Sequence, residues 1–290
     1  MKVGIVYPQP EIQGDISAVS TIARAVEDRG FDHLLVYDHV LGVEHADRDR
    51  ELQGPYTEQD PFTDPLVMFA YLAGITQRIQ LMSGVLILPQ RQTPLVARQA
   101  ADVDLLSGER LILGVGIGWN HIECEALGYD FSTRGVRCGE QIELLKQMWT
   151  GDVVSYDGRF ERAERVRVHP APRRSIPVWI GGFAPPAIDR AGRLADGFVA
   201  AGPIDIGIQV MQGVDAARAA HGRADEAFGH TFVTLTSTTE DDAVASAEKW
   251  QAAGGTHVSI CTMGMGFGTS VQAHLDCIGR VADRLGVEAP

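Results

Sequence analysis

One adjacent pair of ionisable side chains is placed where it could move a proton for a bound ligand. Asp38 and His39 follow the apolar run His33–Tyr37, whose composition is typical of a buried strand. Histidine changes charge near neutral pH and can act as a general acid or base, while a neighbouring carboxylate can hold a polar ligand edge or favour the imidazolium. A lone histidine is often a packed structural residue. Its position after a strand is what favours a catalytic role for His39.

A glycine interrupts the next apolar run, residues 79–88, at the sequence Ser83-Gly84-Val85. A glycine inside a strand marks a bulge or a close approach to the backbone, and it can equally make room for packing. Thr93, followed by a proline, is expected to cap the helix that comes next. This segment therefore predicts either a ligand contact or a packing site at Gly84.

Two further turns expose backbone after later strands. One contains Gly116 and ends at Asn120, which could hydrogen-bond a ligand, cap the following helix, or do both. The other is the pair Gly181 and Gly182, which precedes a helix start. Free amides at such a start can bind a phosphate, although a plain turn is the commoner use of two glycines.

Composition excludes several classes of partner. The net charge of −13 argues against nucleic acid or an anionic membrane surface as a partner. The sequence has no stretch of 18 apolar residues free of charges, so no transmembrane helix is predicted. The four cysteines lack CxxC spacing, and the amino-terminal apolar run is too short for a signal peptide, so a cytoplasmic location is expected. His121, Glu123 and Cys124 could ligate a metal, but no second cluster completes a site, and we predict none.

Apolar runs and helix patterns alternate along the chain. The strand-like runs lie at residues 3–7, 33–37, 79–87, 111–115, 178–180, 197–200, 231–236 and 257–261. The helix-like segments lie at residues 16–29, 65–76, 94–106, within 121–149, and at 185–194, 204–221, 240–253 and 270–285. Eight strand–helix pairs predict an α/β fold of the (β/α)8 TIM-barrel class. The rival, a doubly wound sheet, would place a glycine fingerprint in the first unit, where the chain instead has Tyr7-Pro8-Gln9-Pro10.

Two insertions interrupt this alternation, and residues 1–290 are otherwise expected to form a single domain. Residues 45–63, after the second strand, are polar and could be either a lid over the substrate or a solvated surface loop. Residues 151–177, between the fourth and fifth strands, contain Asp157-Gly158 between alternating apolar residues, which predicts a hairpin.

Three motifs together resemble the luciferase-like superfamily, and specifically its branch of coenzyme F420-dependent oxidoreductases. They are RGFDHLLVYDHV at 29–40, IQLMSGVLILPQRQTPLVARQAADVDLLSGERLILGVGIGWN at 79–120, and IPVWIGGFAPPAIDRAGRLADGFVA at 176–200. The resemblance runs from Met1 to about Ala200 and is more diffuse afterwards. It implies a TIM barrel with an insertion, commonly a homodimer, that binds the deazaflavin F420.

The resemblance also implies roles for matching positions. Ser83, Gly84 and Val85 would form a bulge with a non-prolyl cis peptide behind the deazaflavin ring. Asp38 and His39 match a pair near the redox ring, with Asp38 positioning its polar edge.

Four more positions would contact the cofactor. Gly116 and Asn120 match cofactor contacts, and Gly181 and Gly182 match backbone amides near the phosphate-bearing tail. His39 would be the catalytic proton donor or acceptor.

Two departures narrow this interpretation. A sugar-phosphate dehydrogenase of the family has an acidic residue where Ile117 stands, which argues against glucose 6-phosphate as the substrate. Many FMN-using relatives have an aromatic residue where Gly135 stands, which favours F420 over the alternative cofactor FMN. The sequence thus predicts hydride transfer between the deazaflavin C5 and a small organic substrate. The alternatives are an FMN-dependent monooxygenase and a non-catalytic flavin-binding relative.

Overall fold

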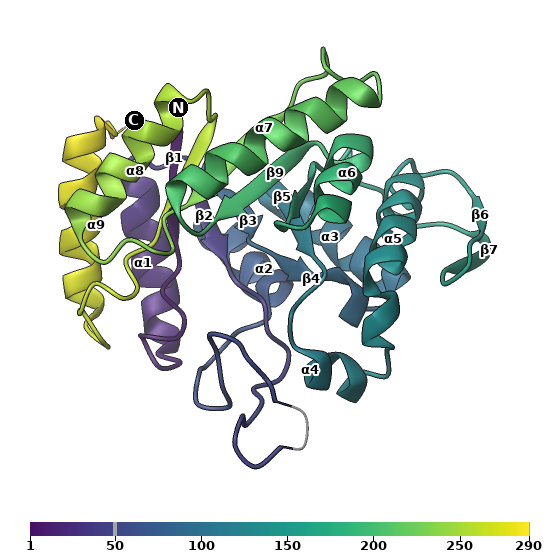
Figure 1. The fold of residues 1–290 in the computed structure, drawn as a ribbon, viewed down its shortest axis with the longest axis horizontal. Coiled ribbons are helices and arrows are strands. Elements are labelled where there is room, and N and C mark those ends of the chain that lie inside the picture. Colours follow the sequence, from purple (N-terminus) through teal and green to yellow (C-terminus); the bar gives the residue numbers. More distant parts are fainter. Residues whose placement is uncertain (49–50, 290) are drawn as a thin grey trace.

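The computed structural model describes residues 1–48 and 51–289, and in this part of the chain parallel strands close into a barrel (Figure 1). The strands are β1 (Lys2–Val6), β2 (His33–Val36), β3 (Gln80–Ser83) with β4 (Leu86–Ile87), β5 (Leu111–Gly116), β8 (Val178–Gly181), β9 (Gly197–Ala201), β10 (Gly229–Val233) and β11 (His257–Ile260). Strand β1 pairs with both β2 and β11, and β3 pairs with β5, so the ring has no free edge. The predicted (β/α)8 TIM barrel is confirmed.

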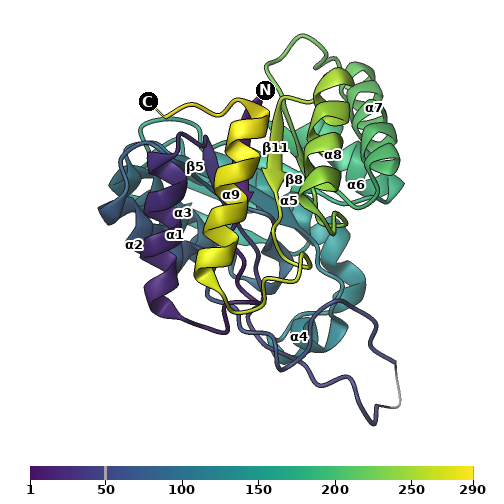
Figure 2. The same cartoon turned by 90° about the vertical axis from the view of Figure 1, so that its left-hand side faces the viewer.

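Helices surround the barrel, and α1 and α9 lie side by side on its outside (Figure 2). They are α1 (Ile16–Asp28), α2 (Pro65–Ile75), α3 (Thr93–Ser107), α4 (His121–Ala126), α5 (Arg134–Met148), α6 (Pro185–Leu194), α7 (Ile204–Ala220), α8 (Glu240–Ala252) and α9 (Val271–Leu285). Within these residues, no helix combines the length and apolar character needed to cross a membrane.

Three sequence expectations need correction at this level. Thr93 is the first residue of α3 and not its cap, because its hydroxyl donates to Glu161 Oε2 at 2.7 Å. The strand expected at 231–236 begins at Gly229 and ends at Val233, after which the Leu235 amide turns back to the Val233 carbonyl. The helical region within 121–149 is two helices.

The third strand is broken where the sequence placed a bulge. It divides into β3 and β4, and the peptide bond between Gly84 and Val85 is cis and non-prolyl, as the resemblance implied. Neighbouring glycines make room for this bulge. A Cβ on Gly114 would lie 1.9 Å from the Ser83 carbonyl oxygen, and one on Gly116 would lie 2.4 Å from Val85 Cγ2.

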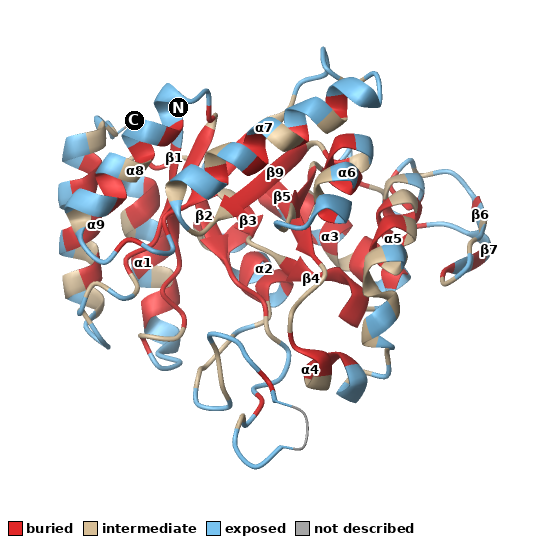
Figure 3. Ribbon diagram, in the orientation of Figure 1, coloured by how far each residue is buried: buried red, intermediate tan, exposed pale blue. Residues whose placement is uncertain are grey.

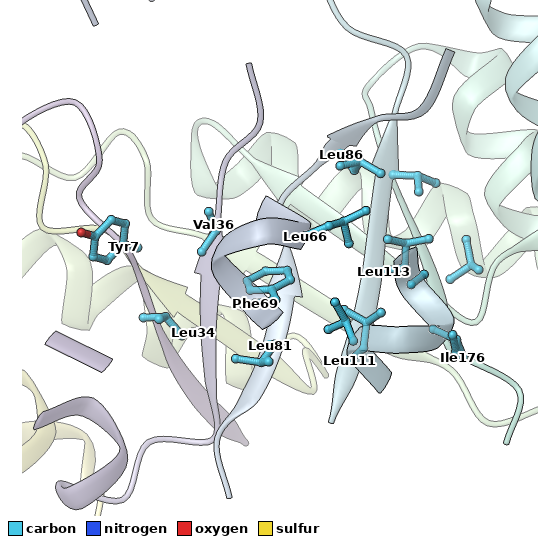
Figure 4. Packing of buried hydrophobic residues seen from close by; sticks show 14 of the residues in the cluster. Tyr7, Leu34, Val36, Leu66, Phe69, Leu81, Leu86, Leu111, Leu113 and Ile176 are labelled. Atoms are coloured by element: carbon cyan, nitrogen blue, oxygen red, sulfur yellow. The ribbon is translucent and has the colours of Figure 1, made fainter. Parts of the chain in front are cut away.

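Apolar side chains fill both the space under the helices and the barrel interior. Leu66 and Phe69 of α2 pack on the outside of the strands against residues such as Leu81 and Leu113 (Figure 4). Burial is concentrated in the strands and on the inner faces of the helices (Figure 3). Inside the barrel, the Trp179 ring fits because Gly197 and Gly229 have no side chain; a Cβ on either glycine would overlap the ring. The strand positions are thus held rigidly from both sides.

The two insertions lie in different places. Strands β6 (Val154–Asp157) and β7 (Arg162–Val166) form an antiparallel hairpin outside the helix ring, beyond α5 (Figure 1), which confirms the hairpin expected at Asp157-Gly158. The insertion after β2 is an irregular segment that lies beside α4. It is at the opposite end of the molecule from the two chain termini (Figure 1). Two residues of that insertion, 49 and 50, lie outside the described residues.

Candidate active site

A cavity of about 380 Å³ opens at the carboxyl ends of the strands, the end at which barrel enzymes place their chemistry. It collects residues from the loops that follow β2, β3, β5, β8 and β10, from the strands β4 and β9, and from the insertion after β2. Of the predicted site residues, it is lined by Asp38, His39, Gly84, Val85, Gly116, Gly181 and Gly182. The tertiary structure therefore brings together groups that are up to about 140 residues apart in the sequence.

The floor of this cavity is built from the bulge and two glycines. Val85 rests its Cγ2 methyl against Gly116 and its Cγ1 methyl against Gly181, where a Cβ would lie 2.9 Å away. A Cβ on Gly84 would lie 2.4 Å from the buried Leu35 side chain. Gly84 thus lines the cavity and also makes room for packing, so both interpretations of this glycine hold. The result is a surface of backbone and small apolar groups suited to a flat ring.

Two predicted residues do not line this cavity. Ser83 is buried, and its hydroxyl donates to the Gly114 carbonyl at 2.8 Å. Asn120 caps α4, since its side-chain oxygen accepts from the Glu123 amide at 3.1 Å. Asn120 also lines a small void beside His39, beneath the insertion after β2. The structure supports the capping role that the sequence left open for Asn120, and it places Ser83 behind the bulge.

His39 is held by a buried carboxylate that the sequence did not single out for this role. Its Nδ1 lies 3.0 Å from Glu123 Oε2, and Glu123 is fully buried in α4. The other oxygen of Glu123 accepts from the amides of Val40 and Leu41, at 2.6 and 3.1 Å. Burial alone would raise the pKa of the Glu123 carboxyl, but the His39 ring and these amides lower it below its ordinary value. A charged Glu123 fixes the His39 ring through Nδ1 and leaves Nε2 outside that contact.

Both carboxylate oxygens of Asp38 accept hydrogen bonds from other residues of the protein. Its Oδ2 accepts from the Ile87 amide at 2.8 Å, and its Oδ1 accepts from Arg91 at 2.7 Å. Arg91 also bonds Asp64, at 2.8 Å. Burial raises the pKa of the Asp38 carboxyl, and the Arg91 guanidinium opposes that rise. Asp38 therefore ties the end of β2 to β4, directly beyond the bulge.

Three aromatic rings surround His39. Phe62 and Tyr56 come from the insertion after β2, with ring centroids 4.8 and 5.4 Å from that of His39, and Trp119 follows β5 at 5.5 Å. The insertion packs closely on Trp119, because a Cβ on Gly54 would lie 2.1 Å from the Trp119 ring. The His39 side chain is only 10% exposed, so these rings shield it from water. This contact favours the lid interpretation of the insertion over a solvated loop.

The glycine pair at the end of β8, Gly181 and Gly182, has an unusual backbone conformation and is followed by a helix with an unusual first turn. Gly182 has a φ of 148°, which side chains rarely adopt. The next helix, α6, begins with Pro185 and Pro186, which have no N–H group, and the Ala187 amide donates to the Ala184 carbonyl at 2.8 Å. Any phosphate contact here would therefore come from the loop before α6 and not from its first turn.

Sequence reasoning missed Glu123, Arg91, Tyr56 and Phe62 as parts of the site. Trp119 stood within the glycine-spaced turn, where an aromatic side chain next to exposed backbone was a usable signal. Glu123 lies 84 positions from His39, and nothing in the local pattern connects the two.

A closed barrel with a cavity at the carboxyl ends of its strands has the arrangement that is typical of TIM-barrel enzymes. The sequence profile described as Luciferase-like monooxygenase matches residues 1–274, so the chain belongs to the luciferase-like monooxygenase family. The resemblance drawn from the three motifs is confirmed at this level.

Among sequence relatives, an uncharacterized protein of Mycobacterium tuberculosis is 32% identical over 204 residues, which cover 68% of this chain and 69% of the relative. An F420-dependent glucose-6-phosphate dehydrogenase of Nocardia farcinica is 33% identical over 184 residues, 61% of this chain and 51% of the relative. The chain thus matches about half the length of that dehydrogenase.

Solved structures share the fold at low identity. An F420-dependent secondary alcohol dehydrogenase in complex with an F420–acetone adduct has a TM-score of 0.79 at 13% identity, covering 98% of both chains. The monooxygenase RslO1 from Streptomyces bottropensis has a TM-score of 0.76 at 17% identity, covering 97% of this chain and 98% of the other.

Proposed function

We propose that this protein is a coenzyme F420-dependent oxidoreductase that transfers a hydride between the deazaflavin C5 and a small organic substrate. One observation carries the proposal: His39, oriented by Glu123, lies beside a flat floor of bulge and glycines in a shielded cavity. Relatives named as F420-dependent dehydrogenases support the choice of cofactor.

The residues present fit a deazaflavin. A side chain on Gly116 or Gly181 would displace Val85, so a ring can lie on Val85 and the surrounding backbone. When bound, the deazaflavin would supply the hydride chemistry. The phosphate-bearing tail would run toward Gly181 and Gly182, whose loop precedes α6.

The protein's own residues would orient the reactants and move the proton. His39 would exchange that proton at Nε2, while Glu123 holds the ring through Nδ1. Asp38 has both oxygens bonded to protein donors, but a carboxylate oxygen accepts more than one hydrogen bond, so it could also receive a polar ring edge. Tyr56, Phe62 and Trp119 would exclude water from the reacting groups.

We further infer one domain over residues 1–290, a homodimer, and a cytoplasmic location. The outer faces of α2 and α3 support the dimer, because they expose Val67, Tyr71, Leu95 and Leu106. Apolar patches of this kind mark association surfaces. The sedimentation mass of the purified protein, with Tyr71→Glu as the disrupting variant, tests this assembly.

The cofactor assignment is tested by titration. F420 should bind at least tenfold more tightly than FMN, a difference of about 1.4 kcal/mol. Fluorescence or calorimetric titration of the purified protein with each cofactor measures both constants. Equal or reversed affinities would refute F420 as the cofactor and favour the FMN-dependent monooxygenase. Tight F420 binding without turnover of any substrate would favour a non-catalytic relative.

A further inference from the structure

The cavity at the carboxyl ends of the strands has no positively charged side chain among its described lining residues. Its ionisable members are Asp38, His39, Tyr37 and Tyr56, and the remaining side chains are apolar or glycine. Arg91 contacts the lining residue Asp38 but does not itself line the cavity, and its guanidinium is bonded to the carboxylates of Asp38 and Asp64. A phosphate or carboxylate of a substrate beside His39 would lose its hydration without gaining a lysine or arginine partner, whereas the cofactor's phosphate-bearing tail is proposed to lie at the backbone of Gly181 and Gly182.

The walls offer apolar contact instead. On one side, the rings of Tyr56 and Trp119 flank His39. The lining also includes Val199 of β9, Val233 at the end of β10, and Leu235 just after β10. Aromatic and branched side chains of this kind stabilise an apolar ligand by burying its surface.

His39 is the one group of the lining that combines a titratable ring with a buried ionic partner. Its Nδ1 is committed to Glu123 at 3.0 Å, so its Nε2 serves a single developing charge on the substrate. One imidazole, in a lining whose other ionisable members are the Arg91-bonded Asp38 and two tyrosines, matches a substrate with one polar reacting group.

We propose that the substrate is an uncharged, largely apolar carbonyl compound or the alcohol formed from it, with Tyr56 and Trp119 determining this preference. This inference rests on the proposed hydride transfer. Reduction adds a hydride to the carbonyl carbon, breaks the C=O π bond and adds the His39 proton to the oxygen, giving the alcohol as the cofactor is oxidised. Oxidation of the alcohol is the reverse, with His39 accepting the proton.

Calorimetric titration with a series of neutral ketones, from cyclohexanone to larger ring and chain ketones, tests the preference against glucose 6-phosphate. The titration is run on the protein with and without bound F420, so the preference is measured even if F420 does not bind. The best neutral ketone should bind at least tenfold more tightly than glucose 6-phosphate. Tighter binding of the phosphate, or binding of none of the ketones, overturns the proposal.

Single substitutions test which lining residues set the preference for a neutral ketone over a phosphate. Trp119→Ala and Tyr56→Ala should each weaken ketone binding at least fivefold, whereas Tyr156→Ala, in the hairpin away from the cavity, should not change it. Leu235→Arg places a cation in the lining and should narrow the gap between ketone and phosphate at least tenfold. Unchanged ketone affinity in both aromatic variants, or no change of preference in Leu235→Arg, overturns the assignment of these walls.

Discussion

Replacing Glu123 with glutamine tests the proposed proton path, because it removes a charge and keeps the shape of the side chain. The glutamine oxygen can still accept from the amides of Val40 and Leu41, which lie 2.6 and 3.1 Å from the present carboxylate oxygen. Only the contact to His39 Nδ1 changes, since an amide NH2 group would face it where a carboxylate oxygen does now. We therefore expect a folded protein in which the His39 ring is held less firmly.

The size of the effect follows from this single contact. A hydrogen bond to a charged group contributes about 1.5–3 kcal/mol. At about 1.4 kcal/mol per factor of ten in rate, loss of that contact should slow a step that depends on the oriented His39 ring by about 10–100-fold.

The assay is single-turnover hydride transfer, followed by the deazaflavin absorbance across a pH series, with cofactor affinity measured in parallel. Near neutral pH the rate should fall about 10–100-fold, while cofactor affinity stays within about threefold. Glu125→Gln is the matched control, because Glu125 is an exposed residue of the same helix. An unchanged single-turnover rate in a folded Glu123→Gln protein would refute the positioning role of Glu123.

Three further predictions follow from the same structure. His39→Ala should lower the single-turnover rate by roughly 10²–10⁴-fold with a much smaller change in cofactor affinity; a rate within about threefold of wild type would remove His39 from the mechanism. Gly116→Ala should lower the free energy of unfolding by about 1–3 kcal/mol, because its Cβ would lie 2.4 Å from Val85 Cγ2. Adding Val85→Ala should restore most of that loss in urea denaturation, whereas Gly279→Ala, with open space around it, should cost nothing; an absence of rescue would show that the contact is not the cause. Burial lowers the pKa of His33 to about 3 and that of His257 to about 4, so both are neutral in the folded protein and gain a proton on unfolding below about pH 6.5. The stabilisation that they contribute is therefore complete above that pH and is lost on acidification. The free energy of unfolding should fall between about pH 7 and about pH 5, and His33→Gln should make that fall smaller by about 1–2 kcal/mol. The control His169→Gln changes an exposed histidine and should leave the fall unchanged.

The elements of this fold were predictable because each one carries its own local signal. Apolar runs marked the strands, Asp15 and Asp64 cap the helices that follow them, and Gly108 ends α3 in a left-handed conformation with a φ of 70°. The interruption at Gly84 marked the bulge. One exception came from a distant contact: Thr93 was expected as a helix cap, but its hydroxyl donates to Glu161, 68 positions away.

The sequence by itself determined the alternation of strands and helices, the barrel, and the positions after strands where chemistry belongs. Periodicity and turn residues act over a few positions, and the barrel topology then sets which ends of the strands meet. Only the tertiary structure decided which side chains touch. It paired His39 with Glu123 and Asp38 with Arg91, and it brought Tyr56 and Phe62 onto the His39 ring. These contacts join segments far apart in the chain, and they depend on loop paths and packing that no local pattern encodes.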